Sequence, residues 1–346
     1  MQETDVASLY ARKLSRWTLI ILGLVGALVI TVMVSVCIGT ADIPLGEVVQ
    51  ILMGGGGHAG HRAIILEVRF PRVLLGAMVG AALALAGAAM QGLFKNPMAS
   101  PYILGLSSGG AFGASLAIVL GISFATGAFA IPVMAFVFSF ITLFIVYNIS
   151  KVGGRTPVET LLLSGIAVGA FFSALVSFMK YIAGDQLSSI VFWMMGGLWT
   201  ADWDRVMVII PFLLVGTVII FILSRDLNAM MMGEDHAVNL GVNTQTVTKL
   251  VLLAASLTTA AAVSVSGIIG FVGLIVPHIM RIMVGPDHRI LLPSTLIVGA
   301  IFMIMMDTLA RTVMGSEELP VGILTAIMGA PFFLYLLRRR KRLTGW

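Results

Sequence analysis

Ten long apolar runs, separated by short segments that carry most of the charge, constrain this chain more than any other feature. An α-helix needs about 20 apolar residues to cross the hydrocarbon core of a bilayer. The chain is 59% hydrophobic and only 11% charged, a balance unlike that of a soluble domain. A bilayer admits only helices or closed barrels, and barrel strands would show short alternating segments. We therefore predict an all-α, polytopic membrane protein with ten transmembrane helices. The predicted spans are Trp17–Ile38, Val73–Phe94, Ile103–Leu120, Gly127–Ile149, Thr160–Tyr181, Val206–Leu223, Leu250–Val265, Ile268–Val284, Leu291–Val313 and Val321–Leu337.

The distribution of Lys and Arg predicts the orientation of these spans. With the N-terminus inside, 15 of the 21 basic residues fall on the inner side and the other six on the outer side. Positive residues collect on the cytoplasmic side of a membrane, so we expect both termini in the cytoplasm. The basic charge follows from this topology and predicts no nucleic-acid partner. Residues 1–346 are interpreted as a single transmembrane domain of the cytoplasmic (inner) membrane, surrounded by lipid.

Glycine and proline predict two features of the helix packing. The eighth run is short, glycine-rich and interrupted by Pro277, so we expect a bent or partly re-entrant helix there. Small residues four apart allow helix backbones to approach closely in lipid. Such pairs are Gly76 and Gly80, Gly109 and Gly113, and Gly165 and Gly169.

The motifs of self-sufficient enzymes are absent from this sequence. It holds no G-x-x-x-x-G-K-[S/T] loop, no H-E-x-x-H pair and no cysteine cluster, since Cys37 is alone. His58 and His61 share one glycine-rich segment, but two histidines do not complete a metal site. We expect no catalytic residue, no metal and no cofactor on this chain, and any ATP hydrolysis must come from a separate protein.

Asp307 is a carboxylate inside the ninth apolar run, where an unpaired charge is costly. Arg311 follows one helical turn later on the same face. One interpretation is a local ion pair that satisfies both groups. The alternative is a proton or substrate relay in an ion-coupled secondary transporter.

The inner segment of about 225–249 is long and mixes acidic residues with Met and Leu. From Met230 to Leu240 it predicts one or two short amphipathic helices, with Gly233 and Gly241 as turns. Such a segment can dock a partner or lie on the membrane surface. Glu234 and Asp235 would face an anionic leaflet in the second case, which favours docking.

The outer segment Glu67–Arg72 reads EVRFPR and carries two arginines three residues apart. Pro71 restricts the backbone between Arg69 and Arg72. Paired arginines suit the carboxylates of a partner, and they equally suit anchoring to lipid headgroups.

Several strings together resemble one family, the permeases of ABC importers for iron–siderophore, haem and cobalamin, which include the vitamin B12 permease. The resemblance runs in order from about residue 65 to 340 and does not distinguish between these chelates. Its strings are RFPR (69–72), GAALALAGAAMQGLFKNPMASPYILGLSSGGAFG (80–113), FWMMGGLWTADW (192–203), MMMGEDHAVNLGV (230–242), GFVGLIVPHIMR (270–281), DHRILLP (287–293) and ELPVGILTAIMGAPFFLYLL (318–337).

The resemblance implies a type II ABC importer permease that works as a homodimer. Two cytoplasmic ATP-binding cassette ATPases, which hold the ATP and Mg²⁺, would bind below, and an extracytoplasmic substrate-binding protein would dock above. Asn96 and Met98 match the family's inner gate, and the segment 153–159 departs from the family pattern, so no gate residue is assigned there. The residues expected to contact the ATPase are Met230, Gly233, Glu234, Ala237, Leu240 and Gly241, and those expected to receive acidic residues of the binding protein are Arg69, Arg72 and Arg311.

Overall fold

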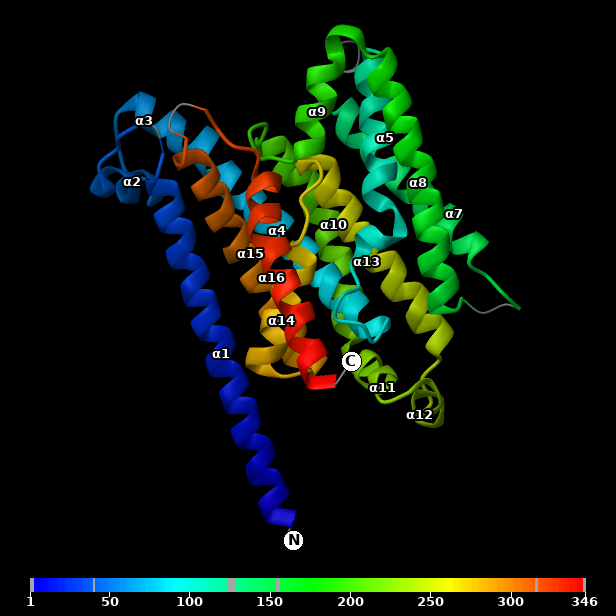
Figure 1. Ribbon diagram of the computed structural model, residues 1–346. Coiled ribbons are helices and arrows are strands. Elements are labelled where there is room, and N and C mark those ends of the chain that lie inside the picture. Colours follow the sequence, from blue (N-terminus) through cyan, green and yellow to red (C-terminus); the bar gives the residue numbers. More distant parts are fainter. Residues whose placement is uncertain (1–2, 40, 123–128, 154–155, 315–316, 345–346) are drawn as a thin grey trace.

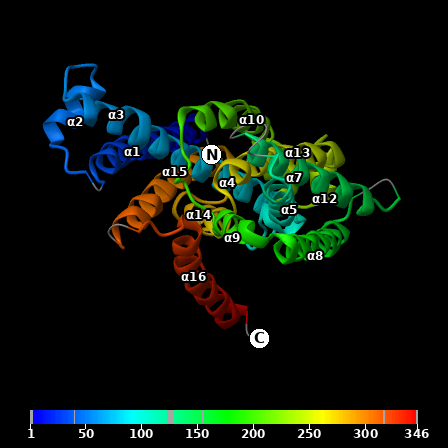
Figure 2. The ribbon, with the colours of Figure 1, turned by 90° about the horizontal axis from the view of Figure 1, so that it is seen from above.

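The computed structural model describes residues 3–39, 41–122, 129–153, 156–314 and 317–344, and every regular element in these ranges is helical. The long helices lie side by side (Figure 1), and from above the first three helices occupy one edge of the molecule and α8 the opposite edge (Figure 2). The elements are α1 (Glu3–Cys37), α2 (Leu45–Leu52), α3 (Ala59–Ala63), η1 (Ile64–Arg69), α4 (Phe70–Leu93), η2 (Pro101–Leu104), α5 (Leu106–Val119), α7 (Ala130–Ile149), α8 (Val158–Ile182), η3 (Gly184–Gln186), α9 (Leu187–Met195), α10 (Trp203–Ile222), α11 (Ser224–Met231), α12 (Glu234–Asn239), α13 (Thr244–Ser266), α14 (Val272–Val284), α15 (His288–Thr312) and α16 (Val321–Thr344).

Seven helices among the described residues are long and apolar enough to cross a membrane. Three shorter apolar helices, Leu106–Val119, Val272–Val284 and Val321–Tyr335, correspond to the third, eighth and tenth predicted spans. Each predicted apolar run therefore contains a helix, although α5, with 14 residues, and α14, with 13, are shorter than a full span. The predicted start of the fourth span, Gly127, lies outside the described residues.

The segment Glu67–Arg72, expected to be an outer connection, is helical instead. Residues Ala59–Leu93 form one continuous helical stretch, with a π-helical turn over Ile64–Arg69. The N–H of Phe70 donates to the carbonyl of Ile65, five residues earlier. Pro71 follows directly and has no N–H to offer, so a wider turn is accommodated next to it.

Helix α4 is the centre of the bundle, and α1 is at its edge. In the most apolar stretch of Ala59–Leu93, 83% of the residues are buried, against 11% for that of α1. α4 packs against α13, α14 and α15, while α1 packs mainly on α15. The faces that α1 leaves open are apolar, with Leu19 and Leu22 exposed by more than half of their surface. A helix that is apolar all round requires lipid or another protein around it.

The paired glycines lie where helices meet, as predicted. A Cβ at Gly80 would meet the carbonyl oxygen of Gly299 in α15, and a Cβ at Gly113 would meet that of Met134 in α7. Gly105 adds an unpredicted break between η2 and α5, with φ of +75°. The third run is thereby divided into a short turn and a helix of 14 residues.

In the structure the eighth run forms only a short helix, in agreement with the prediction of an irregular span. α14 has only 13 residues, with Pro277 inside it, and the stretch from Gly267 to Gly270 before it is not helical. Phe271, directly before α14, is in the left-handed region with φ of +67°. The hydroxyl of Tyr102 donates to the carbonyl of Ile269 over 2.9 Å, which satisfies one polar group of the irregular stretch.

The two ends of the bundle differ. The segment α11–α12 projects from one end, and the N-terminal end of α1 and the C-terminal end of α16 are at that end too (Figure 1). We call this the α11–α12 end. The opposite end, here the α9 end, carries α2, α3 and α9 together with the start of α10 (Figure 1).

Candidate functional site

The predicted pair of short amphipathic helices is present at the α11–α12 end. α11 ends at Met231, and α12 covers Glu234–Asn239. Gly233, with φ of +134°, makes the turn between them, and Gly241, with φ of +83°, ends the second. Both backbone conformations are rarely accessible to residues with a Cβ, so the chain needs glycine at these two positions.

One side of this helix pair is anchored in the bundle and the other is exposed. Met230 and Ala237 are buried. Met232, Val238 and Leu240 expose 71%, 55% and 67% of their surfaces, although all three are apolar. The exposed carboxylates Glu234 and Asp235 lie beside them, and so does exposed Gly241. We call Met232, Glu234, Asp235, Val238 and Leu240 the docking face, because exposed apolar residues of this kind mark interaction sites.

A network of polar side chains ties α11 to the start of α15. The Oδ1 atom of Asn228 accepts from the backbone N–H of His288 and lies 2.8 Å from the Nδ1 atom of the same histidine. The Nδ2 group of Asn228 donates to Asp287 Oδ1 over 2.8 Å. His288 is completely buried. We call Asn228, Asp287 and His288 the polar latch.

The polar latch extends to two further helices. Asp287 pairs with Arg289 at 2.8 Å and with Lys13 of α1 at 3.3 Å. Hydrogen bonds from Arg289, and further ones from Asn228 and Lys13, hold the pKa of Asp287 well below its usual range. On the other side the His288 ring lies against Gly92, near the end of α4, where any Cβ would collide with it. These contacts connect α11 with the start of α15 and the end of α4.

The predicted gate residues lie in the turn after α4, close to the helix pair. Asn96 Oδ1 accepts the backbone N–H of Met98 over 3.0 Å, and both side chains are half-buried. A cavity of about 340 Å³ adjoins this turn. Its walls come from the end of α4, the start of α8, the start of α13, and Met230 and Glu234 of the α11–α12 segment. The turn with the gate residues and the docking element therefore border one common space.

A buried ion cluster lies at the opposite, α9 end. Arg72 of α4 donates to both oxygens of Asp307 of α15, at distances of 2.9–3.1 Å. Arg311 lies 3.1 Å from the same carboxylate, which confirms the predicted local ion pair one helical turn apart. Asp307 is only 2% exposed, and two guanidinium groups compensate its charge. Arg72 also pairs with Glu318 at 2.8 Å, and Glu318 is the one member of the cluster with a clearly exposed side chain, at 35%.

The three arginines expected to receive acidic residues of the binding protein are buried. Arg69, Arg72 and Arg311 are 4%, 8% and 7% exposed. Arg69 donates to the carbonyls of Val36 and Cys37, the last residues of α1, and so caps that helix. The sequence did not show that Arg69 and Arg72 are buried, because their acceptors lie on α1 and α15, which are distant in sequence.

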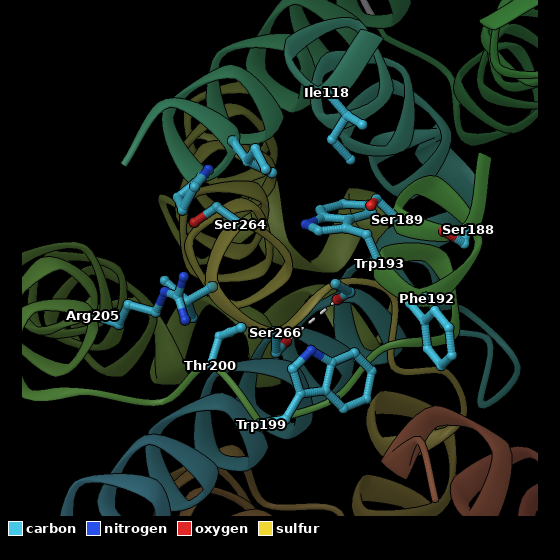
Figure 3. Close-up of a pocket in the computed structure, with 15 residues that line it drawn as sticks. Ile118, Ser188, Ser189, Phe192, Trp193, Trp199, Thr200, Arg205, Ser264 and Ser266 are labelled. Carbon is cyan, nitrogen blue, oxygen red and sulfur yellow. Dashed lines mark hydrogen bonds between the residues drawn. The ribbon is translucent and has the colours of Figure 1, made fainter. Parts of the chain in front are cut away.

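A second cavity, of about 330 Å³, lies at the α9 end between α5, α7, α9, α10 and the end of α13. Figure 3 shows Trp193, Trp199 and Arg205 around a common space, with Ser264 and Ser266 on its wall. Within the described part of the chain, no side chain accepts a hydrogen bond from the Arg205 guanidinium, while its backbone N–H donates to Asp202. The cavity thus combines aromatic faces, hydroxyls and one positive charge. The sequence did not predict this cavity, because its lining residues come from separate helices.

These features describe a helical membrane protein with an exposed amphipathic helix pair at one end and a buried ion cluster at the other. The comparisons with known proteins agree. The cobalamin import system permease protein BtuC of Halobacterium salinarum is 46% identical over 81% of this chain and 74% of its own length. The molybdate import system permease protein MolB of Haemophilus influenzae is 39% identical over 93% of this chain and 96% of its own.

A solved structure has the same fold across nearly the whole chain. It is an inward-facing conformation of a putative metal-chelate type ABC transporter, with a TM-score of 0.82 and 37% identity over 92% of this chain and 99% of its own. The pattern of the FecCD transport family matches residues 14–339. This chain belongs to the FecCD transport family and is an ABC transporter permease.

Proposed function

We propose that this chain is the transmembrane subunit of an ATP-driven importer that carries a metal chelate, such as a ferric siderophore, haem or cobalamin, across the cytoplasmic membrane. The observation that carries this proposal is the docking face on α11–α12, since exposed Met232, Val238 and Leu240 need a protein partner. The sequence has no P-loop of its own, so that partner is a separate ABC ATPase. One ATPase would bind each copy of the chain in a homodimer with a type II importer architecture.

The orientation follows from the same element. If ATPases dock on α11–α12, this end is cytoplasmic, and both termini are cytoplasmic too because they lie at that end (Figure 1). Ten crossings agree with this arrangement, with α5 and α14 as the two shorter ones. The partly buried helices α8 and α10, with 28% and 22% of their most apolar stretches buried, leave apolar faces for lipid and for the second copy.

The coupling route proposed here runs through the polar latch. ATP binding would bring the two ATPases together and displace the two docking faces with them. Asn228 would pass that displacement to α15, and His288 would pass it to the end of α4 beside Asn96 and Met98. Alternating access requires that each nucleotide state favours a different arrangement of these helices.

The binding protein is expected to dock at the α9 end. We propose that Arg69, Arg72 and Arg311 attract its acidic residues. Because these arginines are buried, an acidic residue of the binding protein can reach them only by displacing a group that already contacts them. Glu318 already occupies Arg72 on the exposed side of the cluster. An incoming carboxylate therefore competes with Glu318 for Arg72, an exchange that an exposed arginine would not need.

The metal-chelate assignment rests on the family and on the named relatives, and one relative is named for molybdate. The ion-coupled secondary transporter with Asp307 has less support, since both carboxylate oxygens of Asp307 are engaged by arginines. The deciding experiment is gentle purification of the tagged chain from its native membrane, followed by mass spectrometry of its companions. A stoichiometric P-loop ATPase supports the importer. Recovery of the chain alone, active in ion-driven uptake, would overturn it.

A further inference from the structure

A groove at the α11–α12 end lies between the first part of α1 and the last turn of α14. It has a volume of about 520 Å³ and is lined by Arg12, Lys13, Arg16, Trp17, Ile20, Met283, Val284 and Gly285. Three of these eight residues are basic and none is acidic. Neither the proposed transport path nor the docking face uses this groove.

Lys13 pairs with Asp287, but the charges of Arg12 and Arg16 are not balanced by the described residues of the protein. Arg12 and Arg16 are four residues apart on one helix, an arrangement in which like charges repel. Within the described residues neither of them has an ion pair or a side-chain hydrogen bond. Asp287, the nearby carboxylate, is already bound by Arg289, Lys13 and Asn228. An anion between Arg12 and Arg16 would remove the repulsion.

The walls of the groove are suited to a molecule that is polar at one end and apolar at the other. Trp17 stands at its side, with Lys13 Nζ 4.6 Å and the Arg289 guanidinium carbon 5.2 Å from its ring centre. Tryptophan concentrates at the depth of lipid headgroups. Toward the apolar part of the bundle, the surface continues with Leu19 and Met283, 67% and 64% exposed.

We propose that this groove binds the phosphate-bearing headgroup of an anionic phospholipid, with Arg12 and Arg16 as its ligands and the acyl chains along α1 and α14. The lipid would fill the space beside a helix of which little is buried in the protein. Basic pockets between transmembrane helices on the cytoplasmic side bind anionic headgroups in this manner. Free phosphate shares the charge but has no acyl chain, so it would gain nothing from the apolar wall.

The test is a photoreactive residue at Ile20, with the full-length chain reconstituted in vesicles of equal parts phosphatidylglycerol and phosphatidylcholine. We expect cross-links to phosphatidylglycerol in excess. In an Arg12→Gln, Arg16→Gln variant that excess should fall by about 30-fold, at about 1 kcal/mol per basic residue near the surface. The matched control is Lys95→Gln with Arg225→Gln, which removes two exposed charges outside the groove and should leave the excess unchanged.

Two results would overturn the proposal. One is an equal yield of both lipids in the natural sequence, or the same excess in the Arg12, Arg16 variant. The other is loss of the phosphatidylglycerol cross-link when inorganic phosphate is added at constant ionic strength, which would identify a phosphate site. If the double variant does not fold, Arg16→Gln alone is used, with thermal unfolding as the check on folding. None of these outcomes depends on transport, so the proposed function is tested separately.

Discussion

Gly80 of α4 and Gly299 of α15 face each other so closely that a Cβ on either would meet the carbonyl oxygen of the other. We expect Gly80→Ala to force the two helices apart and to lower the free energy of unfolding by about 1–3 kcal/mol, the range for overpacked contacts. Thermal unfolding in detergent measures this loss of stability. Gly26→Ala in α1 is the control, because nothing lies within 4 Å of a Cβ there. An equal effect of the two substitutions would contradict the close contact.

The polar latch gives a second prediction. Asn228→Ala leaves the ring and the backbone N–H of fully buried His288 without their acceptor, so stability should fall by about 1–3 kcal/mol. More specifically, ATP hydrolysis by the reconstituted complex should continue while uptake falls severalfold. Asn148→Ala is the control, since among the described residues its side chain donates only to the carbonyl of Phe144 in its own helix. If uptake and hydrolysis fall in the same proportion, the latch is structural and does not couple the two.

The docking face predicts a loss of ATPase binding without loss of stability. Leu240 is 67% exposed, so Leu240→Gln should leave thermal unfolding unchanged within about 0.5 kcal/mol. At an interface, removal of a central apolar contact costs on the order of 2 kcal/mol, or roughly 30-fold in affinity. Glu234→Gln combined with it should uncouple hydrolysis from uptake. The control is Val152→Gln, an exposed apolar residue outside α11–α12. Undiminished transport in the Glu234, Leu240 double variant would show that α11–α12 is not the coupling element.

The buried ion cluster predicts that removing the charge of one carboxylate strongly lowers the stability of the protein. Asp307→Asn leaves Arg72 and Arg311 without their shared counter-charge, and we expect a loss of about 3–5 kcal/mol of stability. Thermal unfolding with intrinsic fluorescence measures this loss. An Arg311→Met change in the same chain should restore part of it. A fully stable Asp307→Asn protein that has lost ion-driven uptake would instead favour the relay.

The competition between Glu318 and an incoming carboxylate can be measured directly. Glu318→Gln removes the charge that occupies Arg72, so the binding protein should dock several-fold more tightly, and most clearly at low salt. The conservative change Glu318→Asp serves as the control, because it keeps the charge. Weaker or unchanged docking of Glu318→Gln at low salt would return these arginines to a purely structural role.

The fold could be predicted from the sequence because lipid imposes simple rules. Apolar runs and glycine pairs follow from length and close packing, and both lie on helices in the structure. Gly105 escaped prediction because its break depends on α8, where Gly165 and Gly169 lie against it. The number of crossings stays a prediction, since α5 and α14 are shorter than a full span.

The sequence predicted one candidate site, the α11–α12 segment, but not the side-chain contacts that connect it to the rest of the bundle. Met230 to Gly241 could be located because the turns need glycine and the mixture of acidic and apolar residues is visible in one short segment. Asn228 carried no signal, since an asparagine in a helix becomes meaningful only when His288, 60 residues later, is placed against it. The burial of Arg69 and Arg72 was equally invisible, because their acceptors are distant in sequence, whereas the pairing of Arg311 with Asp307 could be predicted from their spacing.

The pairing of Arg72 with Asp307 has a consequence for the biosynthesis of the protein. The two residues are 235 positions apart, so the ribosome completes most of the chain after α4 before the counter-charge exists. During that interval α4 holds a guanidinium near the membrane boundary with no carboxylate to meet it. The shared counter-charge of this cluster therefore becomes available only once α15 has been synthesised.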